Sequence, residues 1–148
     1  MIHFTPSQLQ EVRDHAERAY PDECCGLLVG AVDADDVVTV TRITPSPNVR
    51  IDAGGEGGED RFEIDPQIRF DLMRALQGSD ENIVGHYHSH PDHPAEPSIH
   101  DLGMAFEPEL VWLIVAVNQG QSTDARTWRL NRDTTTITAV NLVIRENS

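Results

Sequence analysis

The sequence predicts a single mixed α/β domain, in which a curved sheet of about seven strands is flanked by two longer helices and one short helix. At 148 residues the chain is long enough to bury a substantial core. Apolar and β-branched runs alternate with two helical patterns along its length, and no internal repeat is present. We therefore expect one domain covering residues 1–148.

The two longer helices are marked by their first turns. Thr5-Pro6-Ser7-Gln8 combines a capping residue, a proline suited to the first helical position and a glutamine three residues after the cap. Pro21 ends this helix. Asp65-Pro66 starts the second helix in a similar way, and Gly78 is its natural stop. The faces expected to be buried are Leu9, Val12, Ala16 and Ala19 in the first helix and Ile68, Leu72 and Leu76 in the second.

Strands are expected where apolar or β-branched residues run between turn-forming residues. Pro45 and Pro47 should break the second strand, and residues 118–124 should form a turn. A short helix is expected to start at Ser98, after a proline-rich loop. The predicted strands cover residues 24–31, 37–43, 61–64, 110–117, 126–130 and 137–144, together with one that begins at Asn82.

The composition excludes two classes of partner. The formal charge is −14, from 25 acidic residues against 11 arginines and no lysine. Such a surface repels phosphate backbones, so nucleic acid is not expected as a partner. The longest apolar run, residues 110–117, is too short to span a bilayer, so no membrane is expected either. The acidity has two explanations, adaptation to high salt or recruitment of a basic partner, and the spread of the acids along the chain favours the first.

The cysteines and the first residues favour a cytoplasmic protein. Cys24 and Cys25 are adjacent, a spacing that rarely forms a disulfide, so a reducing compartment fits. Nothing near them predicts a lowered thiol pKa, so we do not expect a nucleophilic cysteine. Residues 1–4 lack the basic and apolar regions of a secretory signal.

One segment is of low complexity. Residues 52–60 contain four glycines and four acidic residues, which predicts a mobile surface loop. Two explanations stay open for this loop, a tolerated insertion and a flap beside the active site.

The chemistry of the chain is expected within residues 85–101. His88 and His90 are two residues apart on a predicted strand, so their imidazoles project from one face while Ser89 points away. Two imidazoles on one face commonly begin a zinc site, and Asp101 could add a third ligand and leave the fourth position for water. On spacing alone, two plainer explanations remain. The histidines could be exposed polar residues, and Ser98 with Asp101 could form a helix-capping box.

Three motifs that follow one another in the chain favour the zinc site over these plainer explanations. His88-Ser-His90-Pro, with seven residues between His90 and the following Ser98-x-x-Asp101, resembles the JAMM motif of the JAB1/MPN/Mov34 metalloprotease family. That family also places a glutamate near the end of its first helix, before a small apolar strand containing glycine, and residues 23–30 have this form. A lone His-x-His is a weak signal, whereas the three parts in this order are specific. The resemblance covers nearly the whole chain and implies an MPN/JAMM-like fold.

The resemblance implies a role for each motif residue. His88, His90 and Asp101 would bind one zinc ion. Glu23 would be the general base that activates water and then protonates the leaving amine. Ser98 would stabilise the oxyanion, where electrostatic help is usually the largest catalytic contribution. The chain is therefore expected to be a zinc metallopeptidase.

The same resemblance suggests the substrate. Members of the family cleave peptide or isopeptide bonds after the C-terminal tail of ubiquitin-like proteins. This chain is most similar to small prokaryotic stand-alone members, some of which process sulfur-carrier proteins with a Gly-Gly tail, and we favour that kind of partner. The choice between exopeptidase and isopeptidase stays open, as does the oligomeric state.

Two other functions fit the sequence less well. A non-catalytic MPN-like scaffold is disfavoured because every motif position holds the required residue type. A zinc deaminase is disfavoured because the chain has no Pro-Cys-x-x-Cys segment. The other histidines and the tryptophans are expected to have structural roles. We expect His86 to be a hydrogen-bonded histidine in the core or behind the ligands, and His93 and His100 to be exposed or at a pocket rim. Trp112 and Trp128 are expected in the core.

Overall fold

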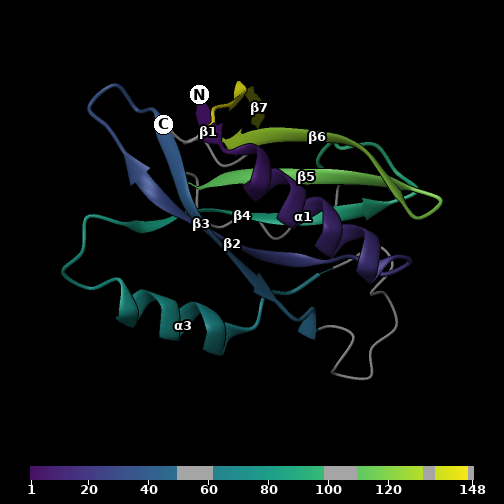
Figure 1. Cartoon of the computed structure of the whole chain (residues 1–148), viewed down its shortest axis with the longest axis horizontal. Coiled ribbons are helices and arrows are strands. Elements are labelled where there is room, and N and C mark those ends of the chain that lie inside the picture. Colours follow the sequence, from purple (N-terminus) through teal and green to yellow (C-terminus); the bar gives the residue numbers. More distant parts are fainter. Residues whose placement is uncertain (50–61, 99–109, 132–135, 147–148) are drawn as a thin grey trace.

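The computed structural model of the protein describes residues 1–49, 62–98, 110–131 and 136–146. In these residues a curved, nearly closed sheet of eight strands is accompanied by two helices, which confirms the mixed α/β class (Figure 1). The elements are β1 (Ile2–Phe4), α1 (Pro6–Ala19), β2 (Cys25–Val32), β3 (Val38–Ser46), α3 (Pro66–Ala75), β4 (Asn82–Pro91), β5 (Val111–Asn118), β6 (Gln121–Leu130), β7 (Ile137–Val140) and β8 (Leu142–Ile144).

Strand β4 lies in the middle of the sheet, whose order is β7-β6-β5-β4-β2-β3-β1-β8. It runs parallel to β5 and antiparallel to β2, and the three strands lie side by side in Figure 1. The antiparallel register pairs Cys25 of β2 with His88 of β4. The beginning of β2 therefore meets the carboxyl-terminal half of β4, where the His-x-His motif lies.

The two helices cover opposite faces of this sheet. Helix α1 has the predicted capping box at Thr5 and buries Leu9, Val12 and Ala16 in the main core, which also contains Leu28 of β2. Helix α3 begins after Asp65, as predicted, and packs Leu72 on the other side of β2. Among the described residues, a further small apolar cluster consists of Ala95, Ile114 and Ala116, with Trp128 packed against it.

Several strand predictions were wrong at their ends. The structure adds the three-residue strand β1, which depends on pairing with β3 and β8, residues far away in sequence. The predicted strand at 137–144 is divided into β7 and β8, which lie at opposite edges of the sheet. The predicted strand at 61–64 is reduced, in its described residues, to one isolated bridge between Asn48 and Ile64.

Two turn predictions also need correction. Strand β3 continues through Pro45 to Ser46. Within the described residues this part of β3 pairs with β2 alone, and a proline without an N–H is tolerated at such an edge. The turn expected over 118–124 is confined to Gln119 and Gly120, both with positive φ, and β6 already begins at Gln121. The helix predicted to follow Ser98 lies outside the described residues, as does the loop at 52–60.

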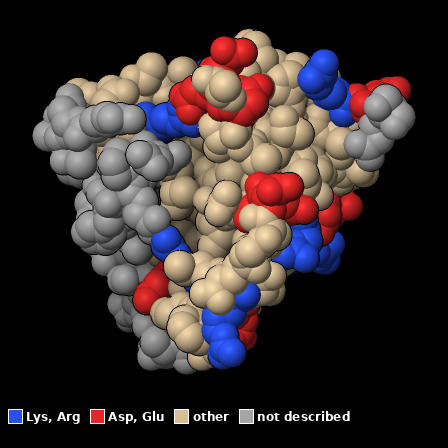
Figure 2. All heavy atoms as spheres, turned by 90° about the vertical axis from the view of Figure 1, so that its left-hand side faces the viewer, with Lys and Arg blue, Asp and Glu red and all other residues tan. Residues whose placement is uncertain are grey.

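The charged side chains are not gathered in a single patch on the face that Figure 2 shows. There, acidic and arginine side chains alternate around an uncharged area. Helices long and apolar enough to cross a membrane do not occur in the described part of the chain.

Candidate metal centre

The register of β2 on β4 places Glu23 beside the end of β4. It lies in the connection between α1 and β2, two residues before Cys25, and only 3% of its surface is exposed. Because Cys25 pairs with His88 in an antiparallel ladder, the chain two residues earlier lies beside His90. The main-chain N–H of Ser89 donates to the carbonyl oxygen of Cys24 at 3.2 Å, which continues this register one step towards Glu23.

The predicted His-x-His pair shares one face of β4 and is buried. His88 is fully buried and His90 is 5% exposed. The two Nε2 atoms face each other at 3.1 Å. A carboxylate oxygen of Glu23 and a ring nitrogen of each histidine lie within 4.8 Å of one another. The structure therefore brings three of the five predicted site residues together in one buried cluster.

This cluster could hold a metal ion. Two imidazole nitrogens bound to one tetrahedral zinc at about 2.0–2.1 Å lie about 3.3 Å apart, close to the observed separation. Nδ1 of His90 lies 2.8 Å from the carbonyl oxygen of Pro94. A proton on Nδ1 donated to this carbonyl leaves the lone pair of Nε2 directed at the cluster, the usual arrangement of a histidine that binds a metal. Nitrogen and carboxylate donors suit zinc.

Aromatic rings enclose the histidines. The ring of Phe62 stacks on that of His88 with centroids 4.3 Å apart and planes 17° from parallel. His86, two residues earlier on the same face, is half-buried, and its ring centroid lies 5.3 Å from that of Trp112. These contacts restrict the rotation of the imidazoles and agree with the structural interpretation of His86. Trp112 is buried and Trp128 is half-buried, with its indole N–H donating to the carbonyl of Ala95.

The neighbouring cysteines are inert, as predicted. Both thiols are free and buried. Burial raises the pKa of Cys24 to about 11 and that of Cys25 to about 12, and the nearby Glu23 adds to both shifts. A raised pKa disfavours the thiolate at neutral pH and so argues against a nucleophilic cysteine.

The other predicted residues differ in how far the structure describes them. Ser98 is half-buried at the end of the segment that follows β4. Asp101 and His100 lie outside the described residues. His93 is exposed and lines a cavity of about 340 Å³ beside Pro94, the residue that contacts His90. This cavity has a mixed lining that includes Asp92, Glu96, Asp124 and Arg126.

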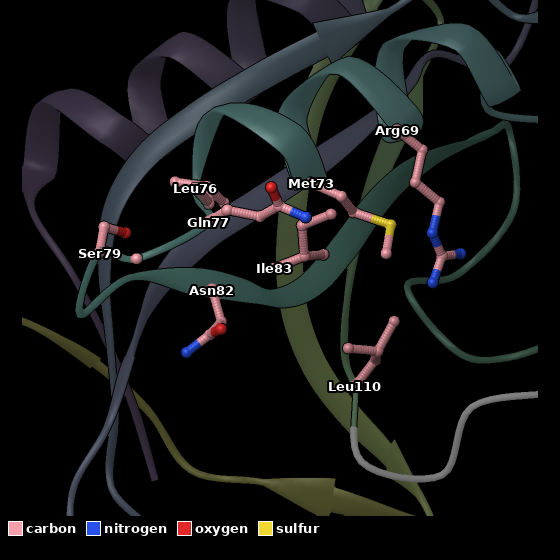
Figure 3. Close-up of a pocket in the computed structure, with 9 residues that line it drawn as sticks. Arg69, Met73, Leu76, Gln77, Ser79, Asn82, Ile83 and Leu110 are labelled. Carbon is pink, nitrogen blue, oxygen red and sulfur yellow. The ribbon is translucent and has the colours of Figure 1, made fainter.

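A second hollow is separate from the cluster. It has a volume of about 360 Å³ and lies between the end of α3 and the start of β4 (Figure 3). Its apolar wall is formed by Met73, Leu76, Ile83 and Leu110, with Arg69 and Ser79 at opposite ends of the view. Six strand residues, or about 20 Å, separate its rim at Asn82 from His88. It is therefore not part of the candidate centre.

Comparisons with known proteins identify the family of the chain. The family model described as prokaryotic homologs of the JAB domain matches residues 5–131. The chain belongs to the Prok-JAB family. This JAB domain resembles a solution structure from Desulfitobacterium hafniense with a TM-score of 0.82 and 29% identity, covering 99% of this chain and 94% of that one. The likeness confirms the expected fold.

Two curated relatives of the JAB domain carry functional names. The desampylase of Haloferax volcanii is 36% identical over 110 residues, which are 73% of this chain and 72% of that protein. The CysO-cysteine peptidase of Mycobacterium tuberculosis is 30% identical over 129 residues, 87% of this chain and 82% of that protein. Both relatives are thus named as hydrolases.

Sequence reasoning missed three residues that surround the cluster. Phe62 was expected only as part of a strand, and no role was expected for Asn48. Ser89 was correctly expected to point away from the imidazoles, but its hydroxyl accepts a hydrogen bond from the N–H of Cys24 at 2.8 Å. None of these contacts is local in sequence, so no spacing pattern could have indicated them.

Proposed function

We propose that this JAB domain is a zinc-dependent peptidase or isopeptidase. Its substrate would be a ubiquitin-like or sulfur-carrier protein, cleaved after a C-terminal Gly-Gly tail. The observation that carries the proposal is the buried cluster of one carboxylate and two facing imidazoles. The names of the two relatives support the class of substrate. We further propose that residues 1–148 act as one domain in the cytoplasm.

The proposed ligands are His88, His90 and Asp101. Zinc bound there would supply a Lewis acid and lower the pKa of bound water to about 7. Burial of the two histidines keeps bulk water out and holds their Nε2 atoms in place before any substrate arrives.

The remaining steps belong to the side chains of the chain. Glu23 would accept a proton from the attacking water while the oxygen of that water adds to the carbonyl carbon of the last glycine. The same carboxyl would then deliver that proton to the departing nitrogen as the C–N bond breaks, so the carboxylate is regenerated. Ser98 would donate a hydrogen bond to the carbonyl oxygen while negative charge develops on it.

The central test compares Glu23→Gln with the parent protein. The parent should contain about one zinc ion per chain and should cleave a sulfur-carrier protein whose Gly-Gly tail is extended. Glu23→Gln should retain the zinc and lose at least about a hundredfold in kcat. Zinc content is measured by elemental analysis, and cleavage by mass spectrometry of two substrates. One substrate carries a single added amino acid, and the other carries a lysine-linked protein.

Glu11→Gln, an exposed acid on α1, is the matched control and should behave as the parent. Parental activity in Glu23→Gln would refute the role of the general base. Loss of zinc in that variant would make Glu23 a ligand instead. Full activity after exhaustive removal of zinc would refute the metal assignment.

A further inference from the structure

Close to the candidate centre, the side-chain amide of Asn48 forms one hydrogen bond through its nitrogen and another through its oxygen. The residue follows β3 and is 7% exposed. Its Nδ2 donates to the carbonyl oxygen of Glu23 at 3.2 Å, and its Oδ1 accepts from the main-chain N–H of Glu63 at 3.0 Å. One partner can only accept and the other can only donate, so the orientation of the amide is determined by its surroundings.

The first of these bonds holds the chain that carries Glu23. That chain is a connection between α1 and β2 rather than part of a strand. Its next residue, Cys24, is bound to Ser89 of β4 through both its N–H and its carbonyl. Asn48 supplies the anchor one residue earlier, on the carbonyl of Glu23 itself.

The second bond holds the chain that carries Phe62. Glu63 is the next residue, and its carbonyl also accepts a hydrogen bond from the N–H of Val49 at 3.0 Å. Both main-chain groups of Glu63 are thus paired with residues 48–49. This pairing places the ring of Phe62 flat against His88, with centroids 4.3 Å apart.

We propose that Asn48 is a positioning residue that holds Glu23 and Phe62 in place around His88 at the same time. The part concerning catalysis rests on the proposed function of Glu23 as the general base. A misplacement of about 1 Å costs about a hundredfold in rate when the misplaced group takes part in the reaction. One amide that fixes two separate chain segments is therefore a sensitive point.

Two substitutions separate the two bonds. Asn48→Asp has the same shape, keeps an acceptor for the N–H of Glu63 and loses the donor to Glu23. It is assayed from about pH 7 to about pH 9, because burial raises the pKa of a carboxyl above its ordinary value of about 4 and the donor is lost only in the ionised form. We expect kcat to fall by at least about tenfold with KM within about twofold. The absorption spectrum of the cobalt-substituted protein should stay that of the parent.

Asn48→Ala removes both bonds and should lower kcat at least as far. In addition it should change the cobalt spectrum and weaken cobalt binding, because Phe62 no longer holds the ring of His88. Thr127→Val is the matched control. The buried hydroxyl of Thr127 donates to the carbonyl of Val140 at 2.8 Å, so this variant also loses one buried hydrogen bond, but between β6 and β7. It should keep the parental kcat and spectrum.

Parental kcat in Asn48→Asp would overturn the proposal, as would a parental cobalt spectrum in Asn48→Ala. A fall in kcat that follows the loss in Tm alike in Asn48→Asp, Asn48→Ala and Thr127→Val would also overturn the proposal, because Asn48 would then contribute only to stability. The cobalt measurements need no substrate. A parent protein that cleaves neither substrate would therefore refute the proposed activity without affecting the test of how His88 is held.

Discussion

The two faces of β4 differ in role, since one packs in the main core and the other carries the candidate metal centre. On the face covered by α1, Tyr87 is fully buried in the main apolar core, where burial raises the pKa of its hydroxyl far above the ordinary value. On the other face, His86, His88 and His90 follow one another at intervals of two residues, and two of them meet Glu23. Because successive side chains of a strand point to opposite faces, a single segment separates stability from chemistry. Substitutions on the two faces should therefore affect different properties.

The largest effect is expected on the imidazole face. His88→Ala should lose zinc binding and cleavage together, because it removes one of two nitrogens that meet at 3.1 Å. Tyr87→Phe, its neighbour on the opposite face, keeps the ring in the core and removes only the hydroxyl. That variant should retain zinc and activity. Zinc analysis, the cleavage assay and thermal unfolding of both variants make the comparison, and a full complement of zinc in His88→Ala would contradict the metal centre.

A smaller effect is expected on the core face, and on stability alone. A Cβ added at Gly26 would lie 2.4 Å from Cε1 of Tyr87, so Gly26→Ala must displace a packed ring. Overpacking of this kind costs about 1–3 kcal/mol in the free energy of unfolding. Urea unfolding of the metal-free protein measures it, and zinc content should be unchanged.

A double-mutant cycle tests the cause. In a Tyr87→Leu background the ring is absent, so Gly26→Ala should be less costly there. An equal cost in both backgrounds would mean that the ring is not what restricts residue 26.

The smallest effect is expected in the pH dependence of stability. Nδ1 of His15 on α1 lies 2.7 Å from the hydroxyl of Tyr87, and burial, with a smaller contribution from Arg18, lowers the pKa of this histidine. The folded state therefore favours neutral His15, and the unfolded chain takes up a proton first as the pH falls. Stability from this group is complete above about pH 6.5 and declines below it.

His15→Gln lacks this titration, so its Tm should fall less steeply between about pH 6.5 and pH 5 than that of the parent. Metal-free protein is used for both, so that loss of bound metal contributes to neither curve. A parallel decline in the two proteins would remove His15 as a source of the pH dependence.

The sequence predicted what is encoded locally. Capping residues and periodic apolar faces located both helices, and alternation correctly put His88 and His90 on one face with Ser89 on the other. Glu23 was recognised through family resemblance, because no spacing rule connects it to β4. Strand β1 was missed because three residues carry little pattern, and their pairing partners lie more than thirty residues away. Asn48 was missed because its role depends on two distant backbones.

The position of the site-bearing strand also governs how the centre is lost on heating. From Gly85 to His88 the backbone of β4 is paired with β2 on one side and β5 on the other. Amide protons in such doubly flanked strands exchange with deuterated solvent only through the largest openings of the molecule. The imidazoles should therefore keep their arrangement until the whole sheet separates, so inactivation and global unfolding should follow one temperature curve.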